Sequence, residues 1–143
     1  MISQRCRYAL KAMLNLARHP SGESKQVSVL AMEEIIPRKF LEGIMSEMRQ
    51  NGLVESTRGK SGGYRLSRPP ELITFGDIMR HIDGPLALLA CVSHNFYKKC
   101  EDCKDEKTCE LRRVMSRVRR EASDILDRTS LADAVAKPEL GVF

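Results

Sequence analysis

The sequence predicts a mainly α-helical fold with one small β hairpin, and three patterns support that prediction. Apolar residues recur at helical spacing through the N-terminal third of the chain. A hairpin pattern with a glycine-rich tip follows at residues 53–66. A heptad seam then runs through residues 111–129. Together these patterns predict a winged helix-turn-helix domain followed by a long C-terminal dimerisation helix.

Three helices are expected before the hairpin. Ser3 is a favourable N-cap for the first, and Ser28 for a short second helix over residues 29–35. Pro37 suits the first turn of the third helix, and Gly52 is a good stop signal after it. The apolar face of the first helix is expected to comprise Ala9, Ala12, Met13, Leu16 and Ala17. Two short helices joined by a tight turn, the second amphipathic, match a helix-turn-helix.

The hairpin that follows has the features of a basic wing. Residues 53–56 and 64–66 are expected to form its strands, with residues 58–63 as a flexible tip. Between residues 56 and 70 there are four Lys or Arg side chains and no acidic one. Thr74 can then cap a fourth helix over residues 75–82.

A helix-turn-helix with a basic wing favours double-stranded DNA as partner, and the net charge of +5 agrees. Arginine can pair with guanine through two hydrogen bonds, glutamate can accept one from cytosine, and arginine also suits a narrow minor groove. A single surface cation is more often merely solvated, but these are grouped. The candidate DNA-binding residues are Arg38, Lys39, Glu42, Arg58, Lys60, Ser61 and Tyr64.

Four of the five cysteines fall within nineteen residues, in a segment rich in Lys, Asp and Glu. They are Cys91, Cys100, Cys103 and Cys109. Thiolates grouped in this way can share an iron–sulfur cluster, of the 2Fe–2S or the 4Fe–4S type, or a zinc ion. Spacing alone favours neither. A third alternative needs no metal: exposed thiols whose pKa is lowered by Lys98, Lys99 and Lys104 would react with oxidants directly.

The heptad seam near the C-terminus predicts a homodimer. Its members are Leu111, Met115, Val118, Ala122 and Ile125. A helix of this length cannot bury the seam against a small winged helix alone, so we expect a second protomer to cover it. The chain then divides into a DNA-binding domain (1–85), a cysteine-rich metal or cluster loop (86–108), a dimerisation helix (109–132) and a tail (133–143).

Composition and motifs also exclude several classes of protein. Hydrophobic residues make up 42% of the chain, enough for a core. There is no secretory or membrane-spanning pattern, so we expect a cytoplasmic protein with no membrane partner. An enzyme is not expected. The pair Cys100 and Cys103 has the spacing of a dithiol redox motif, but it lies in a polar loop, and no nucleophile–base pattern accompanies it.

Several motifs resemble one bacterial family of winged-helix regulators, which includes the iron–sulfur regulator IscR, the nitric-oxide sensor NsrR, the iron regulator RirA and the cluster-free repressor CymR. The motifs are RYALKAM at 7–13, FLEGIMSEMRQNGLVESTRGKSGGYRLSRP at 40–69, ITFGDIMRHIDG after it, and CxLR at 109–112. The resemblance implies a homodimeric repressor whose operator binding is controlled by a cluster that senses iron, redox state or nitric oxide. The alternative is a zinc-stabilised or thiol-based redox-sensing repressor without a cluster.

The resemblance also bears on the ligands. Cluster-bearing members usually have three cysteines with five residues between the last two, as between Cys103 and Cys109. Where they have an Asp or a His as fourth ligand, this chain has Arg7 and Arg112, which cannot ligate iron. Cys100 is therefore the expected fourth ligand, with the alternatives being Cys6 and His94.

Overall fold

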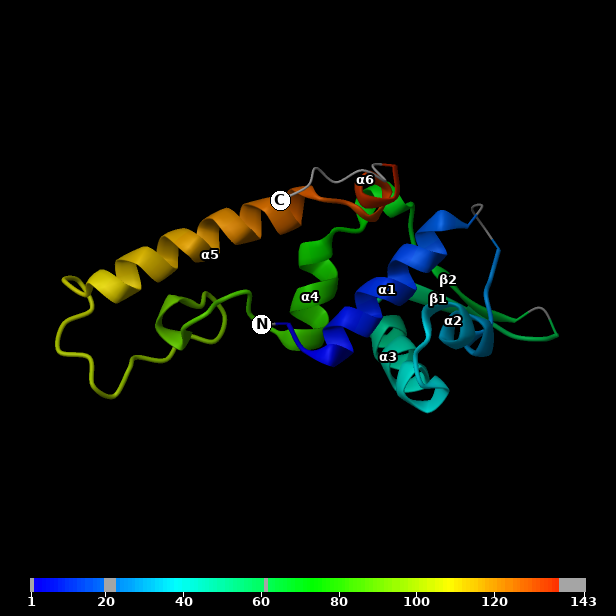
Figure 1. Ribbon diagram of the computed structural model, residues 1–143, viewed down its shortest axis with the longest axis horizontal. Coiled ribbons are helices and arrows are strands. Elements are labelled where there is room, and N and C mark those ends of the chain that lie inside the picture. Colours follow the sequence, from blue (N-terminus) through cyan, green and yellow to red (C-terminus); the bar gives the residue numbers. More distant parts are fainter. Residues whose placement is uncertain (1, 20–22, 61, 137–143) are drawn as a thin grey trace.

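The computed structural model describes residues 2–19, 23–60 and 62–136, and it is mainly helical with a two-stranded antiparallel sheet, as predicted (Figure 1). In chain order the elements are α1 (Gln4–Arg18), α2 (Val27–Glu34), α3 (Arg38–Gln50), β1 (Val54–Thr57), β2 (Gly63–Leu66), the 3-10 turn η1 (Pro70–Leu72), α4 (Phe75–Asp83), the 3-10 turn η2 (Ala90–Val92), α5 (Glu110–Arg128) and α6 (Leu131–Ala136).

The first three helices enclose an aliphatic and methionine-rich core. The Ser3 side chain caps α1 by accepting from the Cys6 N–H at 3.0 Å, as predicted. The prediction for α2 was wrong in detail: the helix begins two residues earlier, at Val27, and Ser28 lies inside it. The largest fully buried side chains of α1 to α3 are Met13, Leu30, Leu41, Ile44, Met45 and Met48.

The wing is a short hairpin that is held against the segment before α2. Residue Val54 pairs with Leu66 and Thr57 with Gly63. Lys25 and Tyr64 exchange two backbone hydrogen bonds of 2.8 Å, so residue 25 extends the sheet by one bridge. A Cβ at position 63 would overlap the Lys25 carbonyl, which explains why glycine begins the returning strand.

The C-terminal elements leave the winged helix and then return to it. Thr74 and Asp77 form a capping box at the start of α4. Figure 1 shows α5 extending away from the winged helix, with the cysteine segment at its far end. The sequence did not predict α6, which brings the chain back: Leu131 is fully buried, and its N–H donates to the Ile73 carbonyl at 2.9 Å. In the part of the chain described, no helix is long and apolar enough to span a membrane.

Candidate functional site

Three of the predicted DNA-binding residues begin α3. Arg38 and Lys39 are exposed in its first turn, and the Glu42 side chain is 44% exposed. The Arg38 Nε donates to Glu42 Oε1 at 3.0 Å. An exposed ion pair one helical turn apart stabilises a helix by only about 0.3–0.5 kcal/mol. Little stability is therefore lost if either side chain leaves its partner to contact a base edge.

The wing presents two cations and one aromatic residue. Arg58 and Lys60 are exposed, and the Lys60 carbonyl accepts from Gln26 Nε2 at 3.1 Å, which ties the wing to the start of α2. Tyr64 is half-buried with its side chain against the core. Ser61, also predicted to contact DNA, lies outside the described residues.

The four grouped cysteines line one cavity of about 290 Å³. Cys91 lies buried in η2, and Cys109 is the N-cap of α5, where its sulfur accepts from the Arg112 N–H at 3.4 Å. Cys100 and Cys103 lie on the irregular segment between these elements and are half-buried. The fold therefore brings together thiols that are up to eighteen positions apart in the sequence.

Two of these thiols, Cys100 and Cys103, have a raised pKa, which is the opposite direction from the lowering by lysines that the metal-free alternative requires. The hydrogen bond with Cys91 and partial burial raise the pKa of the Cys100 thiol. Burial and the neighbouring Cys109 raise the pKa of Cys103, and Lys99 opposes them only in part. At Cys103, burial and the neighbouring sulfur outweigh Lys99, because both disfavour a second negative charge beside the first.

Arg112 braces the cavity, a role that the sequence did not reveal. Its Nε donates to the Cys91 carbonyl at 3.2 Å and lies 3.8 Å from Glu106 Oε1. Glu106 in turn accepts a short hydrogen bond from the Tyr97 hydroxyl. One arginine thus links the start of α5 to η2 and to the cysteine segment.

The four thiols are donors of the kind that either a zinc ion or an iron–sulfur cluster uses. Four sulfurs around one zinc lie about 3.8 Å apart, given Zn–S bonds of about 2.3 Å. Among the described residues, no three Cys, His, Asp or Glu side chains are placed to hold one metal ion. Several irons bridged by sulfide accept more widely spaced thiolates. Neither alternative ligand lines this cavity: His94 lies in another one, and Cys6 is fully buried in α1, where burial and Asp83 raise its pKa to about 11.

The predicted dimer seam lies on a helix that buries none of its 19 side chains. Leu111, Val118 and Ile125 are 56%, 42% and 65% exposed, and Val114 beside them is 53% exposed. Met115 and Ala122 are half-buried against the protein's own surface. The described part of α5 therefore presents a continuous apolar stripe.

A protein-family model described as Rrf2, iron-dependent transcriptional regulator, matches residues 2–137. The chain belongs to the Rrf2 family of transcriptional regulators. A helix-turn-helix (HTH-type) transcriptional regulator, rrf2-like, of Rhodobacter capsulatus is 40% identical over 95% of this chain and 93% of its own length.

Two solved Rrf2-family structures are similar throughout. CymR, the global cysteine regulator of B. subtilis, has a TM-score of 0.80 at 31% identity, over 97% of this chain and 98% of its own. IscR of T. potens has a TM-score of 0.76 at 27% identity, over 97% of this chain and 88% of its own. These likenesses confirm the winged-helix fold, and the Rrf2 family consists of regulators rather than enzymes.

Proposed function

We propose that this Rrf2 regulator is a homodimeric repressor whose operator affinity is controlled by an iron–sulfur cluster bound to Cys91, Cys100, Cys103 and Cys109. The observation that carries the proposal is the single cavity that all four thiols line. When bound, the cluster would supply a link among the four thiolates that is sensitive to iron supply, oxidants or nitric oxide. A repressor of this kind would act in the cytoplasm, beside bacterial DNA.

The cysteine segment is suited to a change between ordered and loose states. Residues 93–109 contain no helix or strand, although all of them are described. Few backbone hydrogen bonds hold the segment, among them Lys98 N–H to the Ala90 carbonyl at 3.3 Å and Cys103 N–H to the Cys100 carbonyl at 3.2 Å. Without ligation of its thiolates, this segment would depend on those bonds, on Arg112 and on local side-chain hydrogen bonds such as that from Tyr97 to Glu106, so the start of α5 would be less firmly placed.

We further propose that a second copy of the chain covers the apolar stripe of α5. Leu111, Val118 and Ile125 would meet their counterparts across a two-fold axis, as in a coiled coil. Such a dimer would present two α3 helices and two wings to a near-palindromic operator, with half-sites about one helical turn or a multiple apart.

A cluster-free redox mechanism is the second candidate, and one contact favours it. The Cys100 thiol is hydrogen-bonded to Cys91, and two thiols this close can be oxidised to a disulfide. The similarity to CymR also permits control that responds to cysteine metabolism. A zinc-stabilised repressor is the third, since four cysteine thiolates are a common zinc ligand set.

Anaerobic purification separates these functions. An iron–sulfur protein will be brown, with visible absorption and matching iron and sulfide content, whereas zinc or thiol proteins will be colourless. Cys103→Ala should abolish the absorption, while Cys6→Ala, outside the cavity, should retain it as the matched control. Unchanged absorption and cluster lifetime in Cys100→Ala would place the fourth ligand elsewhere. Colourless wild-type protein without iron would reject the cluster.

Selection from random DNA at fixed salt, with and without the cluster, tests operator binding. Changes at Arg38 or Glu42 should alter which base is preferred. Each lost bidentate contact should reduce discrimination against the wrong base by about 1–3 kcal/mol. Lys60→Ala should weaken binding to all DNA sequences alike. It should also reduce the slope of log affinity against log salt concentration by about one. Arg58→Ala should weaken binding in a way that depends on the groove sequence. Equal binding of every sequence by both forms would exclude an operator.

A further inference from the structure

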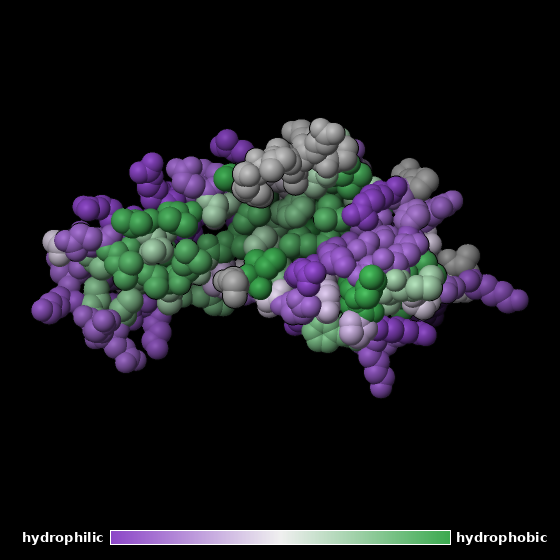
Figure 2. Space-filling model, viewed as in Figure 1, coloured by the Kyte–Doolittle hydropathy of each residue, from purple (hydrophilic) through white to green (hydrophobic). Residues whose placement is uncertain are grey.

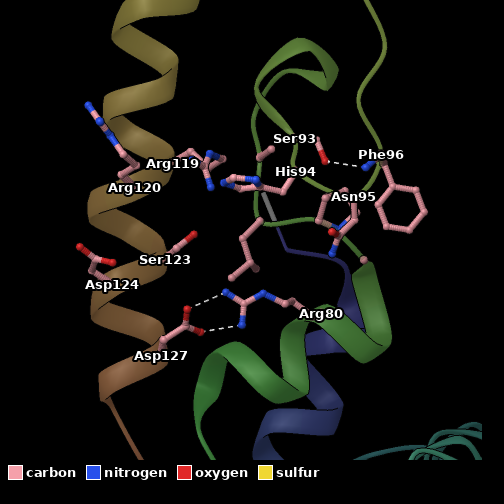
Figure 3. Close-up of a pocket in the computed structure, with 14 residues that line it drawn as sticks. Arg80, Ser93, His94, Asn95, Phe96, Arg119, Arg120, Ser123, Asp124 and Asp127 are labelled. Carbon is pink, nitrogen blue, oxygen red and sulfur yellow. Dashed lines mark hydrogen bonds and ion pairs between the residues drawn. The ribbon is translucent and has the colours of Figure 1, made fainter.

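A second cavity, of about 420 Å³, lies where the winged helix joins α5 (Figure 3). Its walls come from the end of α4, from residues 84–96 and from the middle of α5, and none of the cysteines lines it. This volume falls within the range of about 300–1,000 Å³ typical of small-molecule sites. It plays no part in the function proposed above.

The two carboxylates around this cavity do not supply a free negative charge to its interior. Both oxygens of Asp127 accept from Arg80, at 2.6 and 2.7 Å, so that pair neutralises itself. A Cβ at position 76 of α4 would overlap the Asp127 carboxylate, and Gly76 thus leaves room for the pair. Asp124 and Arg120 also belong to the lining, at its edge, but their side chains are directed to the outer side of α5 (Figure 3).

Donor groups, by contrast, converge on the interior. Arg119 extends from α5 towards His94, which reaches in from the opposite wall (Figure 3). The Arg119 Nε is buried and has no hydrogen-bond partner among the described residues. Ser123 directs its hydroxyl into the same space, and Asn95 lies below His94. A buried donor without a partner is unfavourable, so a ligand that brings an acceptor to Arg119 Nε would complete the arrangement.

We propose that this cavity binds a small organic anion through a carboxylate or phosphate group held between Arg119 and His94. An oxyanion supplies a charged acceptor for the Arg119 Nε, which has none among the described residues, and guanidinium pairs with either group through two parallel hydrogen bonds. Apolar side chains on the 84–96 wall, Leu86 and Phe96 among them, would contact the carbon skeleton. Amino, keto or phosphorylated acids of a few carbons have the right size and charge.

Such an anion would act as an effector, a step that rests on the proposed regulatory function. Arg80 belongs to α4 of the winged helix, whereas Arg119 belongs to the helix that carries the predicted dimer stripe. A ligand between the 84–96 segment and α5 therefore fixes the angle between the DNA-binding domain and α5. That angle sets the distance between the two recognition helices of a dimer, and hence its fit to the operator.

Calorimetric titration of the full-length protein at constant ionic strength tests the site, with inorganic phosphate and succinate as separate probes and chloride as the blank. At least one probe should bind, and the probe that binds identifies the anion class. Arg119→Gln should weaken binding about tenfold or more. Arg120→Gln, which removes an equal charge from the outer side of the same helix, should not.

His94→Gln provides a second variant, because His94 is exposed and its loss should not disturb folding. It should weaken binding of the same probe while leaving cluster absorption unchanged, which separates this site from the cluster, because His94 does not line the cysteine cavity. Absence of heat from both probes, or equal effects of Arg119→Gln and Arg120→Gln, would overturn the site. A probe that binds through Arg119 without altering operator affinity would overturn the effector role.

Discussion

The winged helix and the α5 half of the molecule differ in how they use apolar side chains. Residues of α1, α2, α3 and α4 bury theirs in one core, whereas α5 buries none of its 19 residues. Figure 2 shows an apolar surface along α5 and beneath it, with polar side chains at the far end of the molecule, where the cysteine segment lies, and around the wing. The core of the winged helix is closed by Leu131 of α6. The other half leaves large apolar side chains on its surface.

The largest expected effect concerns stability. Leu53→Ala, in the fully buried part of the core, should lower the free energy of unfolding by about 2–5 kcal/mol. Leu111→Ala removes the same atoms from a side chain that is 56% exposed on α5, and should change it by about 0.5 kcal/mol or less at low protein concentration. Urea unfolding measures both. Equal losses would mean that α5 is part of the core.

The next effect concerns assembly. Val118→Glu together with Ile125→Glu places two charges in the apolar stripe of each protomer. The loss of burial, at about 1.5–3 kcal/mol for each side chain, should raise the dimer dissociation constant about a hundredfold or more. Sedimentation at several concentrations measures this. Arg117→Glu, a charge change on the same helix outside the seam, is the control. A wild-type protein that sediments as a monomer at micromolar concentration would refute the dimer.

Local signals made most of the fold predictable. Ser3 and Thr74 cap their helices because a side-chain oxygen satisfies a nearby N–H, and this depends on neighbouring residues only. Ser28 offered the same signal and was overridden, since α2 begins at Val27 with Gln26 as its N-cap. Four cysteines close in sequence could be predicted to meet. The pairing of Arg80 with Asp127 could not, because it joins residues 47 positions apart through tertiary packing.

The candidate sites also differ in how far the sequence could predict them. The residues at the start of α3 and in the wing could be predicted from their spacing, but the role of Arg112 depends on where η2 lies. Arg119 could have drawn notice from helical spacing alone, since it lies seven residues from both Arg112 and Leu126 and all three are half-buried. A basic side chain on the inner face of an amphipathic helix indicates a buried acceptor or a ligand.

A smaller effect tests a strained backbone position in the winged helix. Ile35 ends α2 in the left-handed region at φ 56°, and its side chain is 86% exposed. This conformation is unfavourable by about 1–2 kcal/mol for a residue with a Cβ. Ile35→Gly should therefore raise the free energy of unfolding by about 1 kcal/mol. Met32→Gly, also exposed but inside α2, should lower it by a similar amount. Thermal denaturation showing the same sign for both would contradict the strain.

The smallest effect concerns the ion pair that joins the two halves. Hydrogen bonds from Arg80 hold the pKa of Asp127 below its ordinary value, which is about 3.9 in unfolded peptides. A lowered folded-state pKa means that the pair stabilises the protein above about pH 4, and that this contribution is lost as the pH falls through the folded value. Both side chains are about two-fifths exposed, so solvent limits the contribution to about 1 kcal/mol or less.

Asp127→Asn removes that contribution at every pH. The stability difference between wild type and variant should be constant from pH 7 down to about pH 5 and should shrink below about pH 4. Asp124→Asn, three residues away on the outer side of α5, should show no such dependence. Denaturation midpoints followed across this range measure the difference. If the difference grew on acidification, Arg80 would not be what holds Asp127, and the junction between the two halves would depend on packing alone.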